Sequence, residues 1–426
     1  MSVYLRNAVH IDWRTLKFSS GHIKVEGGDN GGWRFIDHIP AGADLQKEDT
    51  ILDCRGKLVT RAFGCGHHHA YSALVRGMPP PAVAPVDFQQ KLQYVWWKLD
   101  RALDLDLVRL SALATALECA RNGVTSVIDH HSSPRAIAGS LAAVADAFVE
   151  VGIHVLPCLE LSDRDGEAVR EQGLAETENR LRTGKPCLVG LHASFTVGDD
   201  LLEKAVHLAK KYSAGIHVHT AEDNSDQEMT FAGHGCRVIE RFQEAGVLDC
   251  KKTILAHGLH LDKGERAILK SSPVWLAENM ESNLNNRVGF FNGKGLGDRV
   301  MLGTDGMHSD MLQSARAAYF SGLEYENTGM ADIYRRLRRV HDYFSENGFS
   351  GDGENNLVIL DYPSPTPVNA ENFLGHLFYG LGSRNVDSVI ARGKLIVENK
   401  KILTVDQDEI LAQTRAGAER LWRKMA

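Results

Sequence analysis

The sequence predicts an α/β protein in which a parallel (β/α)8 TIM barrel carries a small β-sandwich built from both ends of the chain. Two observations favour this fold class. Through the middle of the chain, eight short apolar runs alternate with longer helical stretches, the pattern of repeated strand and crossover-helix units. Strand-like segments without such helices occur near both ends, and chain ends often lie close together.

Residues 1–57 contain short strand-like segments separated by glycine, asparagine and aspartate. These segments are 3–11, 21–26, 33–37 and 50–53, and similar ones return at 356–361 and 386–398. We therefore expect residues 1–57 and 356–405 to form one accessory β-sandwich. A segment of helical period at 409–422 predicts a closing helix within a carboxy-terminal unit of residues 406–426.

Residues 58–355 are expected to form the barrel. The eight apolar runs are 57–63, 125–128, 153–159, 187–191, 215–218, 253–256, 273–277 and 299–303. The stretch 201–212 has apolar residues at the spacing of a helix that buries one face, namely Leu202, Ala205, Val206 and Ala209. Between 306 and 353 the pattern is weaker, and only 330–344 gives a clear helical pattern.

The composition favours a small-molecule substrate. Of 426 residues, 43% are apolar and 24% are charged, as in an ordinary globular protein. The net charge is -7 and no block of lysine or arginine stands out, so no nucleic-acid partner is expected. No apolar run approaches the roughly 18 residues that span a bilayer, so no membrane partner is expected either.

The seven cysteines are scattered and include no C-x-x-C pair. This pattern is typical of reduced thiols and disfavours a disulfide framework or a structural zinc site. The amino terminus lacks the basic start and apolar centre of a secretory signal. Together these features predict a cytoplasmic location.

Three consecutive histidines end the first run. Alternation along a strand puts His67 and His69 on one face and His68 on the other, so the pair could hold one metal ion while His68 packs elsewhere. A polyhistidine surface turn is the alternative interpretation. On this motif alone the two interpretations are evenly balanced.

The fifth run ends with two more histidines followed by a carboxylate. His219 lies nearest to the strand end and three residues before Glu222, which would provide one metal ligand and one adjacent proton carrier. His217 shares the same strand face, so alternation alone does not exclude it. We favour His219 as the ligand and a core role for His217.

Single polar residues, His257 and Asp305, end the sixth and eighth runs. Taken alone, a lone histidine at a strand end is more often structural, and Thr-Asp-Gly is usually a turn. In barrels of this kind, however, functional groups come from the carboxyl ends of strands. Because all of these motifs fall at predicted strand ends of one barrel, together they indicate a single site.

This set of motifs resembles the amidohydrolase superfamily, in the subgroup of cytosine, guanine and adenosine-type deaminases and triazine hydrolases. The matching segments are LVTRAFGCGHHH at 58–69, GVTSVID at 123–129, GLHASFTV at 190–197, HTAE at 219–222, AHGLH at 256–260 and LGTDG at 302–306. The resemblance implies that His67, His69, His219 and Asp305 bind a metal. It also implies that Glu222 and His257 complete the catalytic set with Asp305.

Within that subgroup the chain is most similar to the SsnA-like aminohydrolases, over nearly its whole length. The cues are GHHHAYSALVRGM at 66–78, WWKLDRAL at 96–103, IDHHSSP at 128–134, ESNLNN at 281–286 and PTPVN at 365–369. Two features depart from the usual pattern: Arg61 replaces a proline, and residues 14–47 fit the amino-terminal strands poorly. Residues 187–192 contain no lysine, which disfavours a binuclear site bridged by a carboxylated lysine. The resemblance also implies a homodimer or higher homo-oligomer.

Three neutral imidazoles and one carboxylate leave a divalent metal a position for water, whose pKa the metal can lower toward ~7. The expected reaction is hydrolytic deamination of an N-heterocycle, such as a purine or pyrimidine, by the metal-bound hydroxide. Asp305 would take the proton of the water, His257 would orient the nucleophile, and Glu222 would protonate the ring nitrogen or the leaving amine. One metal per subunit is expected; zinc is favoured, while iron and manganese accept the same ligands.

Candidates for substrate contact lie near the predicted strand ends. They are His192, Trp96, Trp97, Ser282, Asn283 and His308. We also expect one of His130 and His131 in the pocket, with the other behind it. A structural role for His192 and core packing of the two tryptophans remain open alternatives.

Two alternative functions remain open. The same site could open a cyclic amide ring by hydrolysis, or the chain could be a non-catalytic scaffold that retains the barrel. The complete set of ligands and proton carriers argues against the scaffold. The chain lacks H-x-E with P-C-x-x-C, a Walker motif, G-x-S-x-G and H-E-x-x-H, so those enzyme classes lose support.

Overall fold

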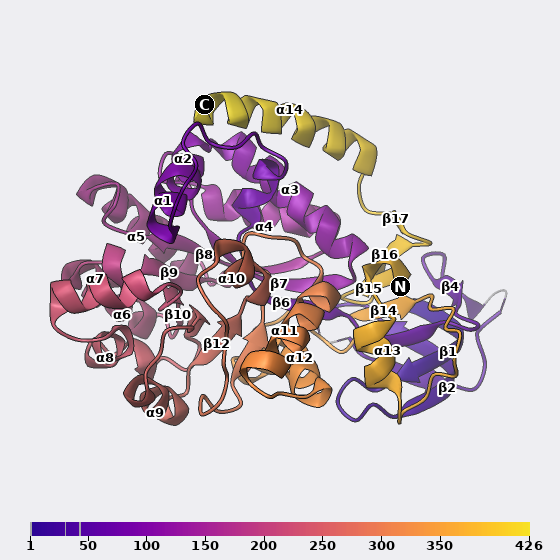
Figure 1. Ribbon diagram of the computed structural model, residues 1–426. Coiled ribbons are helices and arrows are strands. Elements are labelled where there is room, and N and C mark those ends of the chain that lie inside the picture. The colour runs from indigo at the N-terminus through magenta and orange to yellow at the C-terminus, as the bar shows by residue number, and fades with distance from the viewer. Residues whose placement is uncertain (1, 30, 42–43) are drawn as a thin grey trace.

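Eight parallel strands form a barrel at the centre of the molecule (Figure 1). The computed structural model describes residues 2–29, 31–41 and 44–426. In pairing order the barrel strands are β6 (Phe63–His68), β7 (Val124–His131), β8 (His154–Leu161), β9 (Leu188–Ala193), β10 (Ile216–Thr220), β11 (Ile254–His257), β12 (Trp275–Glu278) and β13 (Val300–Leu302). A parallel bridge between His68 and Asp305 brings the two edges of this sheet together. The predicted barrel is confirmed.

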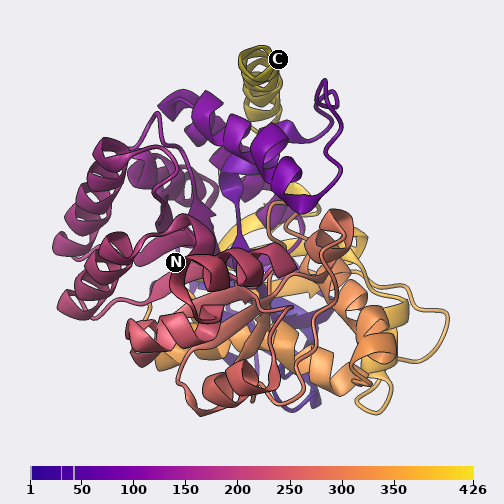
Figure 2. The ribbon, with the colours of Figure 1, turned by 60° about the vertical axis from the view of Figure 1, so that its left-hand side comes forward.

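Helices cover the outside of the barrel, and Figure 2 shows them on opposite sides of the strands. They are α3 (Leu105–Arg121), α4 (Ser140–Val151), α5 (Glu167–Arg182), α6 (Asp199–Lys211), α7 (Asn224–His234), α8 (Val238–Glu244), α9 (Lys263–Ser271), α10 (Met280–Asn286), α11 (Met311–Tyr325) and α12 (Met330–Glu346). Leu202 and Val206 on the expected inner face of α6 are buried. Helix α11 lies in the region between 306 and 353, where the sequence pattern is unclear.

A second, mixed sheet combines strands from both ends of the chain. Its strands are β1 (Ser2–Ile11), β2 (Phe18–Glu26), β3 (Trp33–Ile36), β4 (Thr50–Asp53), β5 (Leu58–Arg61), β14 (Leu357–Leu360), β15 (Val386–Ala391), β16 (Lys394–Glu398) and β17 (Lys401–Ile402). Strand β5 pairs with β1 on one side and with β14 on the other, which joins the two ends. The short helices α13 (Phe373–Tyr379) and η6 (Ser383–Asn385) lie between β14 and β15.

The first predicted run, 57–63, contains two strands that belong to different sheets. Residues Leu58–Arg61 pair within the small sheet, and the barrel strand begins at Phe63. Between them, the backbone N–H of Ala62 donates to the carbonyl of Asn356. The chain therefore passes from the small sheet into the barrel at this residue.

Arg61 fixes this crossing. Its guanidinium donates to Asp352 Oδ2 at 3.0 Å and to Glu354 Oε1 at 2.7 Å, in the segment before β14. Asp352 also accepts hydrogen bonds from His341 Nδ1 on α12 and from the hydroxyl of Ser126 on β7. The Asp352 side chain is fully buried, so one carboxylate holds together the barrel, an outer helix and the small sheet.

Between β6 and β7 the chain forms η2 (Ala70–Val75), α1 (Phe88–Lys91), the π-helical turn η3 (Leu92–Trp96) and α2 (Trp97–Ala102). Turns of π-helix are rare and often occur at functional sites. The last helix, α14 (Gln407–Met425), contacts η2, α2 and α3 at the upper edge of Figure 1. Trp422 Nε1 on α14 donates to the carbonyl of Leu74 at 2.8 Å, so the carboxy-terminal helix supports this segment.

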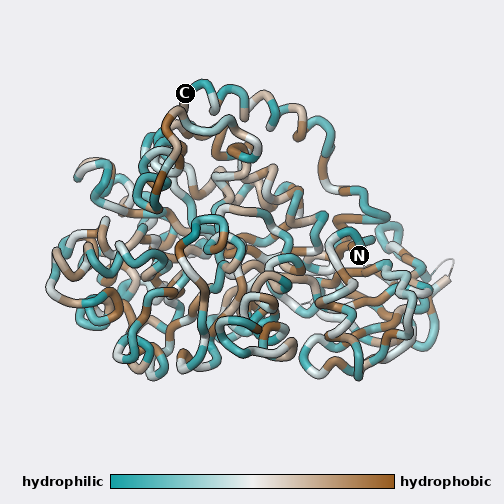
Figure 3. Tube along the Cα trace, viewed as in Figure 1, coloured by the Kyte–Doolittle hydropathy of each residue, from teal (hydrophilic) through white to brown (hydrophobic). Residues whose placement is uncertain are grey.

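The hydrophobic residues gather in the strands and on the inner faces of the helices (Figure 3). Outer helices such as α14 alternate hydrophilic and hydrophobic residues along their length, as expected for helices that bury one face. Within the described residues, no helix combines the length and the hydropathy that a membrane crossing requires. The remaining short helices are η4 (Ser194–Thr196) and η5 (Val247–Asp249).

Candidate metal centre and adjoining cavity

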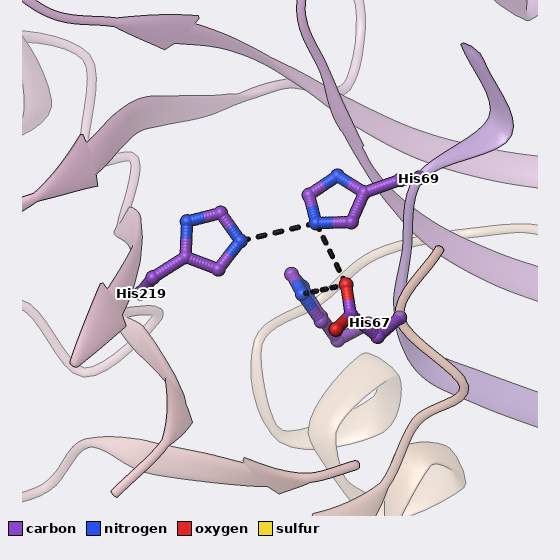
Figure 4. Close-up of side chains that lie close together, drawn as sticks. His67, His69 and His219 are labelled. Carbon is purple, nitrogen blue, oxygen red and sulfur yellow. Dashed lines mark hydrogen bonds and ion pairs between the residues drawn. The ribbon is translucent and has the colours of Figure 1, made fainter. Parts of the chain in front are cut away.

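The four predicted metal ligands lie together at the carboxyl end of the barrel strands. Side-chain atoms of His67, His69, His219 and Asp305, one from each residue, lie within 4.8 Å of one another. His69 Nε2 is 3.0 Å from His219 Nε2 and 3.0 Å from Asp305 Oδ1, while His67 Nε2 is 3.7 Å from that oxygen. The labelled rings converge in Figure 4, and all four residues are buried.

Hydrogen bonds on the far side of each ring fix its orientation. The Nδ1 partners are the His217 ring for His67 at 2.9 Å, the His130 carbonyl for His69 at 2.6 Å and the His192 carbonyl for His219 at 2.8 Å. A carbonyl oxygen only accepts, so Nδ1 carries the proton in His69 and His219. In the neutral rings Nε2 then presents a lone pair to the centre, as in metal-binding histidines.

This donor set fits a divalent cation. Two nitrogen lone pairs 3.0 Å apart, beside a carboxylate in a buried site, repel one another unless a positive charge lies between them. Burial lowers the pKa of His67 to about 4, which favours the neutral ring that binds metals. Burial also opposes a charge on His69, but hydrogen bonding and attraction to Asp305 raise the pKa of His69 to about 9. The centre therefore stabilises positive charge.

Two residues of the centre have strained backbone conformations. Asp305 has φ 54° and His257 has φ 74°, in the left-handed region that residues other than glycine rarely adopt. Next to Asp305, a Cβ atom on Gly303 would lie 2.4 Å from Asn279 Oδ1 and 2.8 Å from the His67 carbonyl oxygen. Only glycine allows the end of β13 to approach β6 this closely.

Glu222 and His257 lie beside the four ligands. Glu222 Oε2 is 3.5 Å from His257 Nε2, and Glu222 Oε1 accepts a hydrogen bond from Asn286 Nδ2 at 3.2 Å. His257 Nδ1 is 2.8 Å from Asn283 Oδ1, which turns Nε2 toward Glu222 and toward Asp305 Oδ2 at 3.9 Å. Burial raises the pKa of Glu222, which favours the protonated form of this carboxyl.

A cavity with about 640 Å³ of empty space, part of it open to solvent, adjoins the centre. His69, His219, Glu222 and Asp305 line the cavity at the centre. The other lining residues are Tyr71, Phe88, Leu92, Trp96, Trp97, Asp100, Glu160, Arg164, His192, Ala193, Phe195, Asp223, Asp226 and Asn286. Several of them are aromatic, and their flat faces can pack against a planar ring.

Three of the predicted substrate contacts line this cavity, namely His192, Trp96 and Trp97. His192 Nδ1 lies 2.6 Å from the hydroxyl oxygen of Thr196. The ring of Trp97 lies with its edge toward His192, at 6.3 Å between centroids. Both tryptophans come from the π-helical turn and the helix that follows it.

Neither His130 nor His131, one of which we expected in the pocket, is among the described lining residues of this cavity. The His130 ring packs behind the centre, 4.6 Å from the His219 ring, and its Nε2 faces the carbonyls of Leu191 and His217. His131 bonds the hydroxyl of Ser133 instead. Both rings are fully buried.

Ser282, Asn283 and His308, also expected as substrate contacts, are likewise not among the described lining residues of the cavity. The hydroxyl of Ser282 donates to Asp305 Oδ2, and Asn283 bonds His257. His308 Nε2 pairs with Glu281 Oε2 at 2.8 Å. The first two residues thus position Asp305 and His257 from helix α10.

Several lining residues were missed from the sequence, above all Asp100, Glu160 and Arg164. Glu160 and Arg164 lie at and just after the carboxyl end of β8, where the sequence-based strand ended at residue 159. That strand end offered an acidic residue four positions before an arginine, a signal that could have been used. Asp100 follows Trp97 by one helical turn, but only the two tryptophans of this segment were taken as candidate substrate contacts.

Comparison with known proteins places the chain among metal-dependent hydrolases. The model of the amidohydrolase family matches residues 58–336. A 5'-deoxyadenosine deaminase of Methanopyrus kandleri is 29% identical over 380 residues, which cover 83% of this chain and 84% of that protein. A 5-methylthioadenosine/S-adenosylhomocysteine deaminase of Pelotomaculum thermopropionicum is 27% identical over 398 residues, 87% of each chain.

A solved structure has the same fold over the full length. It is an adenosine deaminase from Xanthomonas campestris with bound zinc, and it superposes with a TM-score of 0.79. The alignment covers 99% of this chain and 98% of that chain at 17% sequence identity. At this identity the likeness establishes the fold alone.

Proposed function

The chain belongs to the amidohydrolase family, and we propose that it is a mononuclear metal-dependent aminohydrolase that deaminates an N-heterocycle by hydrolysis. Its family makes it a hydrolase of carbon–nitrogen bonds other than peptide bonds. The observation that carries the proposal is the convergence of His67, His69, His219 and Asp305 beside a cavity that Glu222 also lines.

One divalent metal per subunit, most readily zinc, would be held by the three Nε2 atoms and Asp305 Oδ1. When bound, such a metal supplies a water of lowered pKa and a Lewis acid. Strand β9, Leu188–Ala193, offers no lysine for a bridging group, which supports one metal and not two. Zinc is bound in the structurally similar adenosine deaminase.

The residues around the centre can divide the proton transfers between them. Asp305 Oδ2 is held by Ser282 and lies 3.9 Å from His257 Nε2, which suits it to accept a proton from the attacking water. His257, fixed by Asn283, would orient that water and stabilise the charge that develops on attack. Glu222, with its raised pKa, would deliver a proton to a ring nitrogen or the leaving amine.

The substrate class we propose is a purine or a related amino-substituted ring. The relatives are named for adenosine-type substrates, and this chain offers an aromatic cavity wall that includes Trp96, Trp97 and Phe195. A planar ring packed against these faces would bring its exocyclic amine toward Glu222 and the metal centre. We also propose that the protein works in the cytoplasm, in line with its seven free thiols.

We further propose that the protein forms a homodimer or a higher homo-oligomer. Exposed apolar side chains on α11 and α13 support this, with Phe320 and Leu323 each 49% exposed and Tyr379 63% exposed. Light scattering coupled to size-exclusion chromatography would give the mass in solution. A single-chain mass at micromolar concentration would contradict the proposal.

A panel of purines, pyrimidines, nucleosides and hydantoins tests the proposed reaction. The zinc-loaded protein is expected to release ammonia from at least one amino-substituted ring. Detection of a ring-opened acid without ammonia would instead identify a cyclic amide hydrolase. No product from any compound, with zinc fully bound, would contradict the enzyme proposal.

A further inference from the structure

A buried cluster of three charged side chains lines the cavity and takes no part in the proposed chemistry. Asp100 on α2, Glu160 on β8 and Arg164 just after β8 have side chains that are 4%, 3% and 8% exposed. Arg164 is hydrogen-bonded to Glu160, and its Nη1 is 3.5 Å from Asp100 Oδ2. The cluster therefore ties the helix that carries Trp97 to the end of a barrel strand.

The cluster carries no spare positive charge. Arg164 is the one lysine or arginine among the described residues that line the cavity, and two carboxylates contact it. Burial raises the pKa of Asp100 to about 7, so this carboxyl is ionised in only part of the molecules at neutral pH. With Asp100 protonated the cluster is neutral, and with Asp100 ionised it carries one negative charge.

Polar atoms of this wall remain without partners among the described residues. Asp100 Oδ1 and Trp97 Nε1 are both buried and make no hydrogen bond. Arg164 stacks on the Trp97 ring at 5.0 Å, so the ring is held between the cluster and His192. A buried acceptor such as Asp100 Oδ1 is costly unless a donor reaches it.

We infer that Asp100, Glu160 and Arg164 form a specificity subsite that accepts a hydrogen-bond-donating, neutral or cationic group of the substrate and rejects an anionic one. The inference rests on the proposed deamination, because it concerns how the protein recognises a part of the substrate other than the departing amine. An ammonium or hydroxyl group would donate to the free carboxylate oxygen. A carboxylate or phosphate would meet two acids and an arginine whose charge is already balanced.

Three adenine nucleosides that differ only at the 5' position test this inference. They are 5'-amino-5'-deoxyadenosine, adenosine and adenosine-5'-carboxylic acid, titrated calorimetrically into the zinc-loaded Glu222→Gln protein, which should bind without turnover. We expect the amine to bind at least about tenfold more tightly than the carboxylic acid, as for one discriminating buried charge contact. Equal binding, tighter binding of the acid, or no binding of any of the three would overturn the inference.

A pair of variants tests whether the cluster is the cause. Asp100→Asn is nearly isosteric and frees part of the Arg164 charge, so the preference for the amine over the acid should fall by about tenfold. The matched control is Asp163→Asn. This change removes a carboxylate that pairs with Arg170, and Asp163 directly precedes Arg164 in the chain but is not among the described residues that line the cavity. If Asp100→Asn kept the same preference for the amine over the acid, the cluster would not be the cause of that preference. If that variant does not fold, the titration of the three nucleosides still decides the inference.

Failure of this inference and failure of the proposed function give different results. Ammonia release from the heterocycle panel decides the reaction, whichever 5' group is preferred. The order of affinities among the three nucleosides decides the subsite, whether or not the protein turns them over.

Discussion

The Nδ1 atom of His67 lies 2.9 Å from the Nε2 atom of His217. On the other side of the His217 ring, Nδ1 faces the thiol of Cys158 at 3.6 Å, so His217 can keep its own proton there and accept from His67. His217 therefore lies in the core, as the sequence favoured, and also sets the tautomer of a proposed metal ligand. Such partners behind a ligand ring strengthen metal binding.

Replacement of His217 by Leu should weaken zinc binding by about 10-fold to 100-fold, because His67 Nδ1 would lose its acceptor. Chelator competition on purified protein would measure the affinity. His154→Leu is the matched control, since that ring is half-buried on a barrel strand and bonds no predicted ligand. Equal zinc affinity in the two variants would mean that His217 only fills space.

Replacement of Glu222 by Gln should lower turnover by about 10²-fold to 10⁴-fold while zinc content stays at the wild-type level. The amide keeps the size of the side chain but cannot deliver the proton. Steady-state rates and metal analysis on the same sample check both parts. Glu228→Gln, an exposed change on the helix that follows, should leave the rate unchanged. Full turnover in Glu222→Gln would remove this residue from the mechanism.

The buried ion pair of Arg61 and Asp352 should make the protein acid-sensitive. Burial alone would raise the pKa of Asp352, but attraction to His341 and Arg61 holds it well below the ordinary value. A carboxyl whose pKa is lowered by folding stabilises the native state above its unfolded pKa of about 4, and that contribution is lost as pH falls toward the folded pKa. Denaturant titrations from about pH 6 to about pH 3 should show this loss.

Asp352→Asn should cost about 3–5 kcal/mol at neutral pH, because it leaves the Arg61 guanidinium buried without its main partner. The free energy of unfolding of this variant should also fall less steeply with acid than that of the wild type. Asp342→Asn, which breaks an exposed pair with Arg14, serves as the control and should change stability by about 0–1 kcal/mol. Parallel acid profiles for wild type and Asp352→Asn would contradict the assignment.

Gly303→Ala should destabilise the protein by about 1–3 kcal/mol, the usual cost of overpacking, and should reduce zinc occupancy. The added methyl group would press on Asn279 and on the backbone of His67, which carries one of the proposed ligands. Gly348→Ala provides a contrast, since nothing lies within 4 Å of a Cβ there although φ is +68°. Strain alone should then lower stability without any loss of zinc.

Much of the fold followed from periodicity, but helix α11 did not. Its buried residues Met311, Leu312, Ala315 and Tyr319 share one face of the helix, but the apolar side chains of Phe320 and Leu323 are half exposed outside that face and obscure the stripe. The amino-terminal cap, Asp310, marks the start of the helix, because it accepts hydrogen bonds from the backbone of Leu312 and Gln313. The split of the run at 57–63 was also unclear, because both of its strands are buried and only Ala62 separates them.

The four proposed ligands could be located from the sequence because each one falls at the end of a periodic apolar run. Apart from His192, Trp96 and Trp97, most of the other lining residues could not be, since many come from loops, short helices and a π-helical turn whose geometry depends on tertiary packing. His130 shows the same limit: it lies near a strand end, as the ligands do, but its ring packs against the His69 and His219 rings, at 5.4 Å and 4.6 Å between centroids.

Ammonia release, measured as a function of bound zinc, tests directly whether the protein is a deaminase that uses one metal ion. Metal-free protein would be reconstituted stepwise and assayed with the best amino-substituted heterocycle of the panel. We expect the rate of ammonia release to rise linearly with added zinc and to reach its plateau at one zinc per chain. A rate that is independent of zinc, or a fully loaded protein that releases no ammonia from any heterocycle, would contradict this expectation.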